Sequence, residues 1–532
     1  MRIFTLFFTI VSVILSTSCS SDNDDGENGK GTGDSQKTLS VSSTELTFNA
    51  DGETKTFAIT SNTDWQISTF SNDWCTITPS SGSNNATIEV AVRKNEKTSS
   101  RSTRITIKSD AGNKFIDVKQ DAGIYTPPTR PEPTGHYLPL MTITTRSGQT
   151  IIDKVNYIKG NIKIEERDEN GNVTETLLDV EMTEDGIRGR GNSTWGMDKK
   201  PYRIKLDKSV EILGMPRNKH WTLLANYSDK TLMRNEVAFW MSRKAGYAYT
   251  PRQKYVDVKL NGEYLGNYML CEHIRIDQNR VNISEGASVS GGFLFEIDER
   301  RDDISEAYYF DTKGKDEGSH KLIVAVKRPE LPDITEAQKE YVKAHFQKIE
   351  DALYARNGLT PENDLPKYLD VESFIDYFII SELSKNVDGN LRLSTYMYKK
   401  EDDDRLFFGP VWDFDLAFGN ADYNNCFTTE GWYGYDTRWY RYFFRTEKYR
   451  EMLVDRWKEL RSTEFTDAKM FAYIDEVAAE LEISQQKNFE RWKILDKKVW
   501  PNYKVPGSYR GEIAYLKEFI SKRAAWMDRE LQ

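Results

Sequence analysis

A proline-rich stretch divides this chain and limits how it can fold. Residues Tyr125–Gly135 hold four prolines in eleven positions. Each proline fixes its own φ, removes a backbone N–H donor and restricts the residue before it, so such a run favours an extended, semi-rigid connection. We therefore assign residues 124–135 to a linker and expect the 532-residue chain to fold as separate domains on either side of it.

Before the linker, apolar and polar residues alternate in short runs from Leu39 to Gly123. Clusters of Asp, Gly, Ser and Asn separate the runs, as turns do. Seven short period-two runs over 85 residues are typical of an immunoglobulin-like β-sandwich, which we predict for residues 38–123. The runs are Leu39-Val41, Leu46-Phe48, Phe57-Ile59, Trp65-Ile67, Ile88-Val92, Ile105-Ile107 and Ile116-Val118.

Residues 136–532 change character halfway along. The first half has strand-like runs at 141–144, 160–164, 202–206, 255–260, 264–271 and 292–297, with one helix at about 230–244. In the second half apolar residues recur at helical spacing, which predicts helices at 337–354, 371–384 and 509–531. A strand-rich half followed by a helix-rich half predicts an α+β domain of two lobes with a cleft between them, which is also the outline of a protein kinase.

Composition excludes several classes of protein. With 73 basic and 83 acidic side chains the net charge is −10, which argues against nucleic acid as a partner because phosphate binding needs a basic face. A mean hydropathy of −0.66 excludes a polytopic membrane protein. Four Cys and five His are too few for a disulfide framework or a zinc array. The chain has no Walker A sequence, no Gly-x-Ser-x-Gly elbow and no His-Glu-x-x-His helix.

The first 19 residues have the pattern of an export signal. Arg2 precedes an apolar run, Ile3–Leu15, that is shorter than the roughly 20 residues needed to span a bilayer. Small residues lead into Cys19, and this resembles a bacterial lipobox, in which the Cys becomes the lipidated N-terminus. The alternative is ordinary signal cleavage with Cys19 uninvolved.

Residues 20–37 are acidic, polar and rich in Gly, so we expect a disordered tether. An acidic stretch after a lipidated Cys resembles the surface-export signal of Bacteroidetes lipoproteins. We therefore expect an outer-membrane lipoprotein at the cell surface, or otherwise a periplasmic or extracellular protein. Its contact with the membrane would be through the N-terminal lipid only.

Two carboxylate motifs in the helix-rich half are candidates for chemistry. Asp388 lies in Asn386-Val-Asp388-Gly-Asn390, and 25 residues later Asp413 and Asp415 lie in an apolar, aromatic run. An ionised carboxylate in such a run is costly unless it is paired or bound to a cation. Phosphoryl transfer uses one carboxylate to orient or deprotonate the acceptor hydroxyl and another to hold Mg²⁺. The alternative is that Asp413 and Asp415 cap turns or pair with arginines.

The β-rich segment resembles a BACON domain, on the residues Asn62-Thr-Asp-Trp65, Asp73–Gly82 and Val118-Lys-Gln120. That family is named for proposed carbohydrate binding, and the resemblance makes Trp65 and Trp74 candidate glycan contacts. The alternative is that both rings pack in the sandwich and the domain is a spacer.

Residues 136–532 resemble the CotH family, an atypical protein-kinase fold. The matching motifs are Arg188–Trp195, Lys199–Asp207, Leu223–Asn235, Leu260–Glu272, Gly291–Asp298 and the two Asp motifs. The resemblance implies ATP-dependent phosphorylation of protein Ser or Thr, with Mg or Mn as the metal and a protein acceptor that the sequence does not name.

Carried over to this sequence, Asp388 is the catalytic carboxylate and Asp413 the metal ligand, with Asp415 its helper. Lys205 is the candidate for the nucleotide phosphates, and Lys199 and Lys200 are its rivals. Asn192 and Ser193 lie in a Gly-rich turn whose backbone N–H groups are suited to cover phosphates. Arg234 is expected to be a structural tie to Asp229 or a neighbour.

One feature departs from kinase-like loops, which place an Asn about five residues beyond the catalytic Asp as a second metal ligand. Leu391–Thr395 contains no Asn, and Asn386 and Asn390 are the alternatives. The segment His273–Asp277 faintly resembles a kinase catalytic loop but ends a strand in the other half, so we set it aside. Two further hypotheses stand beside the kinase: an inactive kinase-like scaffold or glycan-binding surface lipoprotein, and the same fold transferring AMP.

Overall fold

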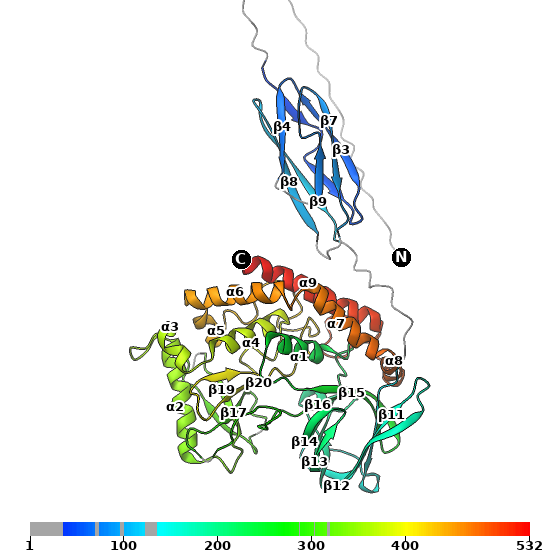
Figure 1. The fold of residues 1–532 in the computed structure, drawn as a ribbon, viewed down its shortest axis with the longest axis vertical. Coiled ribbons are helices and arrows are strands. Elements are labelled where there is room, and N and C mark those ends of the chain that lie inside the picture. The colour runs from blue at the N-terminus through cyan, green and yellow to red at the C-terminus, as the bar shows by residue number, and fades with distance from the viewer. Residues whose placement is uncertain are drawn as a thin grey trace, which may run out of the picture. The chain divides into compact units, whose positions relative to one another are not determined.

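The computed structural model describes residues 36–69, 74–95, 100–122, 136–286, 288–302, 304–316 and 320–532. It forms two compact units, Met1–Ile124 and Tyr125–Gln532, so the boundary falls at the proline-rich stretch (Figure 1). The predicted export segment with Cys19, most of the predicted tether and the linker lie outside the described residues.

The N-terminal unit is all β, as predicted. Its described residues form a four-stranded sheet in the order β1-β3-β7-β5 and a five-stranded sheet in the order β2-β9-β8-β4-β6. Inward residues of both sheets, among them Phe57, Ile88 and Ile105, build one core. The strands are β1 Leu39–Val41, β2 Glu45–Phe48, β3 Thr54–Ser61, β4 Asp64–Thr69, β5 Cys75–Thr78, β6 Ser81–Ser83, β7 Ala86–Val92, β8 Arg101–Ser109 and β9 Gly112–Gln120.

The two candidate glycan contacts differ in their exposure. Trp65 is only 3% exposed, and its Nε1 donates to the carbonyl of Asn84 at 2.8 Å. The prediction that Trp65 contacts a sugar is therefore wrong, because its ring is packed in the core. Trp74 is partly buried, with the Arg101 guanidinium 4.4 Å from its ring centroid. A role for Trp74 stays a prediction.

The C-terminal unit begins with a closed barrel in the order β10-β11-β12-β13-β14-β16-β15. Its interior is filled by apolar residues such as Ile143, Ile204 and Val258, all fully buried. The strands are β10 Leu140–Thr145, β11 Ile158–Arg167, β12 Val173–Gly189, β13 Tyr202–Ile212, β14 Met215–Leu224, β15 Gln253–Leu260 and β16 Glu263–Glu272.

A second sheet, in the order β18-β19-β17-β20-β21, follows the barrel. Its strands are β17 Phe293–Ile297, β18 Tyr308–Asp311, β19 Ile323–Arg328, β20 Thr395–Lys399 and β21 Leu406–Phe408. The remaining elements are helices: α1 Arg234–Ala245, α2 Glu336–Leu353, α3 Pro361–Asp364, α4 Val371–Leu383, α5 Arg438–Phe443, α6 Glu447–Ser462, α7 Asp467–Glu480, α8 Glu482–Arg491 and α9 Tyr509–Glu530, with short 3-10 turns at Arg146–Gly148, Ser193–Gly196 and Leu365–Lys367.

Helices α1 and α4 lie between the sheets and the outer helices α6, α7 and α9 (Figure 1). Helix α1 begins four residues later than predicted because Asp229 organises the turn before it, accepting from the backbone N–H groups of Thr231 at 3.1 Å and Arg234 at 2.8 Å. The α+β prediction for this unit is confirmed. In the described part of the chain, no helix is long and apolar enough to cross a membrane.

Candidate active site

The C-terminal unit contains a cavity of about 370 Å³ between the barrel and the second sheet. Residues of β12, β13 and β14 line one side of it, and residues of β17, β19, β20 and the loops after α4 and β21 line the other. Its volume is within the range of small-molecule sites, but its lining is unusually charged. The basic residues are Lys154, Arg188, Arg190, Arg203, Arg300, Lys327 and Arg328, and the acidic residues are Glu296, Asp298, Asp302, Glu306, Glu330, Asp388 and Asp413.

The fold brings Asp388 and Asp413 into this one cavity. Asp388 lies on the loop between α4 and β20, and Asp413 on the loop after β21. Asn386 joins the two loops, since its Nδ2 donates to the carbonyl of Asp413 at 3.2 Å and its Oδ1 accepts from the backbone N–H of Asp388 at 3.1 Å. The spacing of the two carboxylates is therefore set by a side chain between them.

Asp388 is 7% exposed and has two basic neighbours. Its Oδ1 accepts from Arg392 Nη2 at 2.9 Å, and Arg300 Nη2 lies 3.8 Å away. Burial and the nearby charge of Asp413 raise the pKa of Asp388, although Arg392 and Arg300 act against them. Asp388 is thus a carboxylate whose proton affinity is raised, which suits a group that receives a proton.

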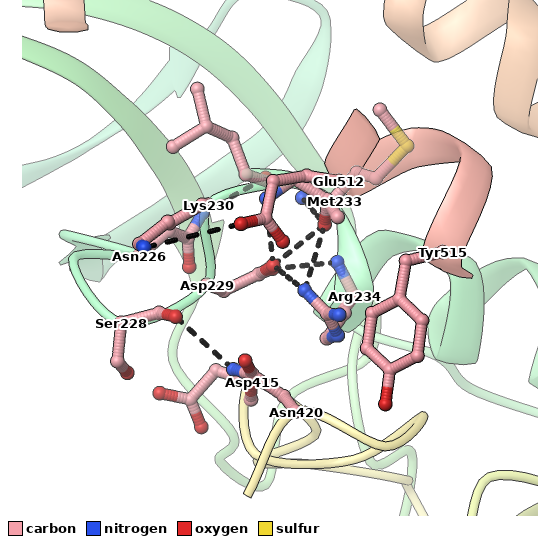
Figure 2. Close-up of polar contacts among 12 residues, drawn as sticks. Asn226, Ser228, Asp229, Lys230, Met233, Arg234, Asp415, Asn420, Glu512 and Tyr515 are labelled. Carbon is pink, nitrogen blue, oxygen red and sulfur yellow. Dashed lines mark hydrogen bonds and ion pairs between the residues drawn. The ribbon is translucent and has the colours of Figure 1, made fainter. Parts of the chain in front are cut away.

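Asp413 and Asp415 differ in position. Asp413 lines the cavity, and its Oδ2 accepts from Ser394 Oγ at 3.0 Å. Asp415 is not among the lining residues, and it lies near Ser228 and Asn420 (Figure 2). Burial, and then the charge of Asp413, raises the pKa of Asp415 well above its ordinary value. Among the described residues, no group of three or more His, Cys, Asp or Glu is arranged to hold a metal ion.

Side chains behind the cavity hold the Asp413 loop in place. The amide N–H of Phe414 donates to Asn235 Oδ1 at 2.7 Å, and Asn420 Nδ2 donates to the carbonyls of Asp415 at 2.7 Å and Ser228 at 3.2 Å (Figure 2). Nearby, Arg234 Nη1 donates to Asp229 Oδ1 at 2.6 Å, with both side chains fully buried. Arg234 is therefore the structural tie to Asp229 that the sequence predicted.

The loops that carry the two aspartates have an unusual backbone. Several of their non-glycine residues have left-handed φ angles: Lys385 44°, Asn390 56°, Leu391 63°, Ser394 48°, Asp413 69° and Phe418 53°. Such conformations are uncommon for side chains as large as Leu and Phe, and they persist only where the surrounding structure imposes them. Clusters of this kind are typical of functional sites.

The residues predicted to bind the nucleotide do not all reach the cavity. Asn192 lines it, and its Nδ2 donates to Asp302 Oδ2 at 2.7 Å, whereas Ser193 is not among the lining residues. Lys205 is not among them either: it points from β13 toward Asp185, with Nζ 2.8 Å from Oδ1. The prediction that Lys205 reaches the phosphates is therefore corrected, because its ammonium is paired elsewhere.

The rival lysines are also placed outside the cavity. Lys199 is 1% exposed, where its Nζ donates to the Asn267 carbonyl and to Asn488 Oδ1. Lys200 donates to the carbonyl of Trp195 at 2.8 Å. Arg203 lies two residues before Lys205 on the same face of β13, and it does line the cavity. The cation that β13 presents to the cavity is thus an arginine.

Sequence reasoning missed most of the arginines of the site. Arg188 and Arg190 lie in the motif that we read for its glycines, and the only available signal was their place in that motif. Arg190 lies over Trp412, with its guanidinium 5.7 Å from the ring centroid. His273, set aside above, also lines the cavity. Burial and the charges of Arg203 and Arg275 hold its pKa well below the ordinary value, so His273 is neutral there.

The structure also shows where Asn386 and Asn390 lie, the two alternatives for the Asn that kinase-like loops carry. The side-chain amide of Asn386 is engaged in joining the two loops. Asn390 Nδ2 donates to the carbonyl of Asn386 at 2.9 Å, and neither residue lines the cavity. The residue of this loop that contacts the Asp413 carboxylate is Ser394, through its hydroxyl, whereas Asn386 contacts the Asp413 carbonyl.

These observations define the class of protein: a multidomain chain with an all-β unit followed by an α+β unit, whose charged cavity collects carboxylates from two strained loops. The particular family follows from the sequence model of the CotH kinase protein, which matches residues 187–527, or 341 of 532 residues. The chain belongs to this family. The model of the viral BACON domain matches residues 38–122, which span the described N-terminal unit.

Solved structures give weaker likenesses. A Bacteroides ovatus GH5 xyloglucanase in complex with a XXXG heptasaccharide is 22% identical over 22% of this chain and 22% of that chain, with a TM-score of 0.16. An NMR structure of a protein from Bacteroides thetaiotaomicron is 19% identical over 19% of this chain and 97% of that chain, with a TM-score of 0.14. At such TM-scores neither bears on function. No curated protein matches the chain.

Proposed function

We propose that the C-terminal unit is a protein kinase that transfers phosphate from ATP to Ser or Thr of an acceptor protein. Membership of the CotH kinase family supports a kinase-like protein. The observation that carries the proposal is the meeting of Asp388 and Asp413, from separate loops, in one cavity whose opposite side is rich in arginine. A catalytic and a metal-binding carboxylate facing a phosphate site are what phosphoryl transfer needs.

The cavity's residues fit a magnesium- or manganese-bound nucleotide. Buried Nε atoms of Arg188 and Arg203 have no hydrogen-bond partner among the described residues, which suits a polyanion. When bound, Mg²⁺–ATP supplies the phosphoryl group and neutralises its charge. Asp388 orients the acceptor hydroxyl and takes its proton on the carboxylate that Arg392 contacts. Asp413, oriented by Ser394, would hold the metal, and Asp415 would support it from behind.

The test uses purified protein with labelled ATP, Mg²⁺ or Mn²⁺ and dephosphorylated casein as a general acceptor. We expect γ-label on protein Ser or Thr, and Asp388→Asn should lower the rate by about 10²–10⁴-fold. That variant should keep the ATP-dependent rise in melting temperature, whereas Asp413→Ala should lose both. Label from the α-phosphate on the product would instead indicate AMP transfer. A folded protein that ATP does not stabilise would favour an inactive scaffold.

We also infer that the chain is exported and anchored through a lipid on Cys19. The support is the sequence alone: one charge, a short apolar run and small residues that lead into a Cys. In a Bacteroidetes host, Cys19→Ala should move the protein from the membrane fraction to the soluble fraction. Unchanged membrane association would contradict the lipid anchor.

A further inference from the structure

Arg188, Arg203 and Arg328 line the cavity, and Arg275 lies beside it, next to the lining residue Ile274. Arg188 lies on β12 and Arg203 on β13, and the two are direct partners in the antiparallel register of these strands. Arg275 follows β16, and Arg328 ends β19. Three of the four also interact through their charges: Arg203 and Arg275 lower the pKa of Arg328, and Arg203 lowers the pKa of Arg275.

This arrangement is unfavourable for the protein alone. Like charges placed directly opposite each other on neighbouring strands repel. Arg188 Nε and Arg203 Nε are buried, and in the described part of the chain they have no hydrogen-bond partner. Native structures rarely leave a buried donor unpaired, so we expect each of these two N–H groups to bind a ligand or an ordered water.

The other two arginines are held in a poorly solvated place. Arg328 is only 7% exposed. Burial, followed by the charges of neighbouring arginines, lowers the pKa of both Arg275 and Arg328 to about 10. Both stay charged at neutral pH, so the cluster presents concentrated positive charge with little water to screen it.

Three glutamates offset this charge incompletely, and one of them, Glu285, acts to raise the pKa of both Arg275 and Arg328. Glu306 lies 3.5 Å from Arg188 and 3.9 Å from Arg203, distances longer than a charge-assisted hydrogen bond. Glu330 contacts Arg328 and lies 3.8 Å from Arg275. The side chains of Glu306 and Glu330 are 48% and 39% exposed, so both carboxylates approach from the solvent side. Glu306 in particular has a loose contact with two arginines at once.

We propose that Arg188, Arg203 and Arg328 form a phosphate-binding subsite whose positive charge Arg275 reinforces, and that Glu306 is a built-in counter-ion which the incoming phosphate displaces. The planar guanidinium fork matches phosphate in a bidentate manner, and the two unpartnered Nε donors provide the free hydrogen bonds. A phosphate group has more charge and more acceptor oxygens than the carboxylate of Glu306, so it satisfies the pair of opposed arginines better.

This inference deepens the proposed function and rests on it in one respect, namely that the phosphates are those of a nucleotide donor. Binding itself requires no transfer. The probes are therefore inorganic tripolyphosphate, ATP and adenosine, each without metal, and the readout is the dissociation constant from calorimetry together with the melting temperature. We expect tripolyphosphate and ATP to bind and adenosine to bind at least tenfold more weakly than ATP.

Three variants sharpen the test. Arg203→Met should weaken tripolyphosphate binding at least tenfold, as expected when a charge-assisted hydrogen-bonding partner is lost. Arg217→Met, on the exposed side of the neighbouring strand β14 and outside the cavity, is the matched control and should leave binding unchanged. Glu306→Gln should tighten binding, because the internal competitor loses its charge. Since Glu306 is half exposed, this variant will fold even if Arg203→Met does not.

The outcomes separate the subsite from the kinase. Equal binding by Arg203→Met and Arg217→Met, or weaker binding by Glu306→Gln, would overturn the subsite even if the protein phosphorylates an acceptor. Binding that depends on Arg203, without any transfer of phosphate to an acceptor, would support the subsite and contradict the proposed kinase activity. Binding of tripolyphosphate but not of ATP would overturn the assignment of the subsite to a nucleotide.

Discussion

The carboxylate of Asp388 lies near one acidic side chain, Asp413, and two positively charged ones, Arg392 and Arg300. Their opposing effects on its pKa set the pH range in which it can accept a proton. Burial and Asp413 raise its pKa, whereas Arg392 at 2.9 Å and Arg300 at 3.8 Å lower it. A general base works only when ionised, so the activity should be lost as the pH falls through this raised pKa.

The first prediction concerns the pH dependence of the activity. Arg392→Met removes the nearer positive charge and should raise the pKa of Asp388 further, which moves the acid limb of the kcat/KM profile to higher pH. Arg300→Met should move it less, since Arg300 is more distant. The measurement is a pH–rate profile of the three proteins with labelled ATP. An acid limb at the same pH in Arg392→Met would argue against Asp388 as the base.

The second prediction concerns a buried ion pair that supports α4. Arg523 Nη2 lies 2.7 Å from Glu382 Oε1, and both side chains are fully buried. Arg523→Met leaves an uncompensated buried carboxylate and should lower the free energy of unfolding by about 3–5 kcal/mol. The control is Arg529→Met on the same helix, whose pair with Glu430 is 58% and 74% exposed and should cost less than about 1 kcal/mol. Denaturant unfolding measures both, and equal losses would contradict the prediction.

Sequence reasoning located the carboxylates of the site but not its arginines. Asp388 and Asp413 stood out because an ionised carboxylate within or beside an apolar run is costly unless it is paired or bound to a cation. Arg203, Arg275 and Arg328 did not, because a charged residue on or beside a strand ordinarily faces solvent. Only the fold of the barrel next to the second sheet brings these distant positions together. Lys205 was predicted from its position on a strand alone. Arg203 and Lys205 lie on the same face of β13, and the sequence does not show which of the two reaches the cavity.

At the scale of elements, the spacing of apolar residues predicted the helices and strands that bury apolar side chains. Helix α2 and helix α4 were found from apolar spacing, and the strands β13, β15 and β16 from apolar runs. Strand β12 was missed because most of its 17 residues are not buried, so it shows little alternation. Strand β6 was missed because its three residues, Ser81–Ser83, are all exposed and small. Strand β12 is defined mainly by its backbone pairing and buries only a few side chains, such as Met182 and Ile187, and β6 buries none.

The third prediction tests a close approach between the Asp413 loop and α9. Gly419 has φ +73°, and a Cβ there would lie 2.5 Å from Phe519 Cδ2 and 2.6 Å from the Tyr515 hydroxyl. Gly419→Ala should therefore destabilise the fold by more than about 1 kcal/mol and reduce the ATP-dependent rise in melting temperature, since the loop must move. Gly507→Ala, at φ +81° with no atom within 4 Å, adds backbone strain alone. If both substitutions cost the same, the contact with α9 has no effect.

At the scale of the whole molecule, the hydrophobic cores of the two described units do not share a residue. The N-terminal unit builds its core from both of its sheets, and the C-terminal unit packs its barrel and helices separately. The proline-rich stretch predicted this division, because such a run favours an extended connection between separate domains. The charge of the cavity could not be predicted at this scale, since the net charge of −10 describes the whole chain and not one wall of one site.

The fourth prediction is that the two units unfold independently. Calorimetry of the full protein should show two transitions, and residues 36–122 produced alone should melt at the temperature of one of them. ATP should raise only the transition of the larger unit, because a ligand stabilises the unit that binds it. A single transition, or one in which ATP raises both, would contradict this independence.

The left-handed residues of the aspartate loops also have a consequence for protein engineering. Leu391 and Phe418 hold conformations that glycine adopts without strain. A search for heat-tolerant variants would therefore recover substitutions at these positions early, as it does wherever a backbone is under strain. Those same positions lie in the loops that carry Asp388 and Asp413. Tolerance to heat and reactivity thus compete for one stretch of chain, and selection for the first alone would erode the second.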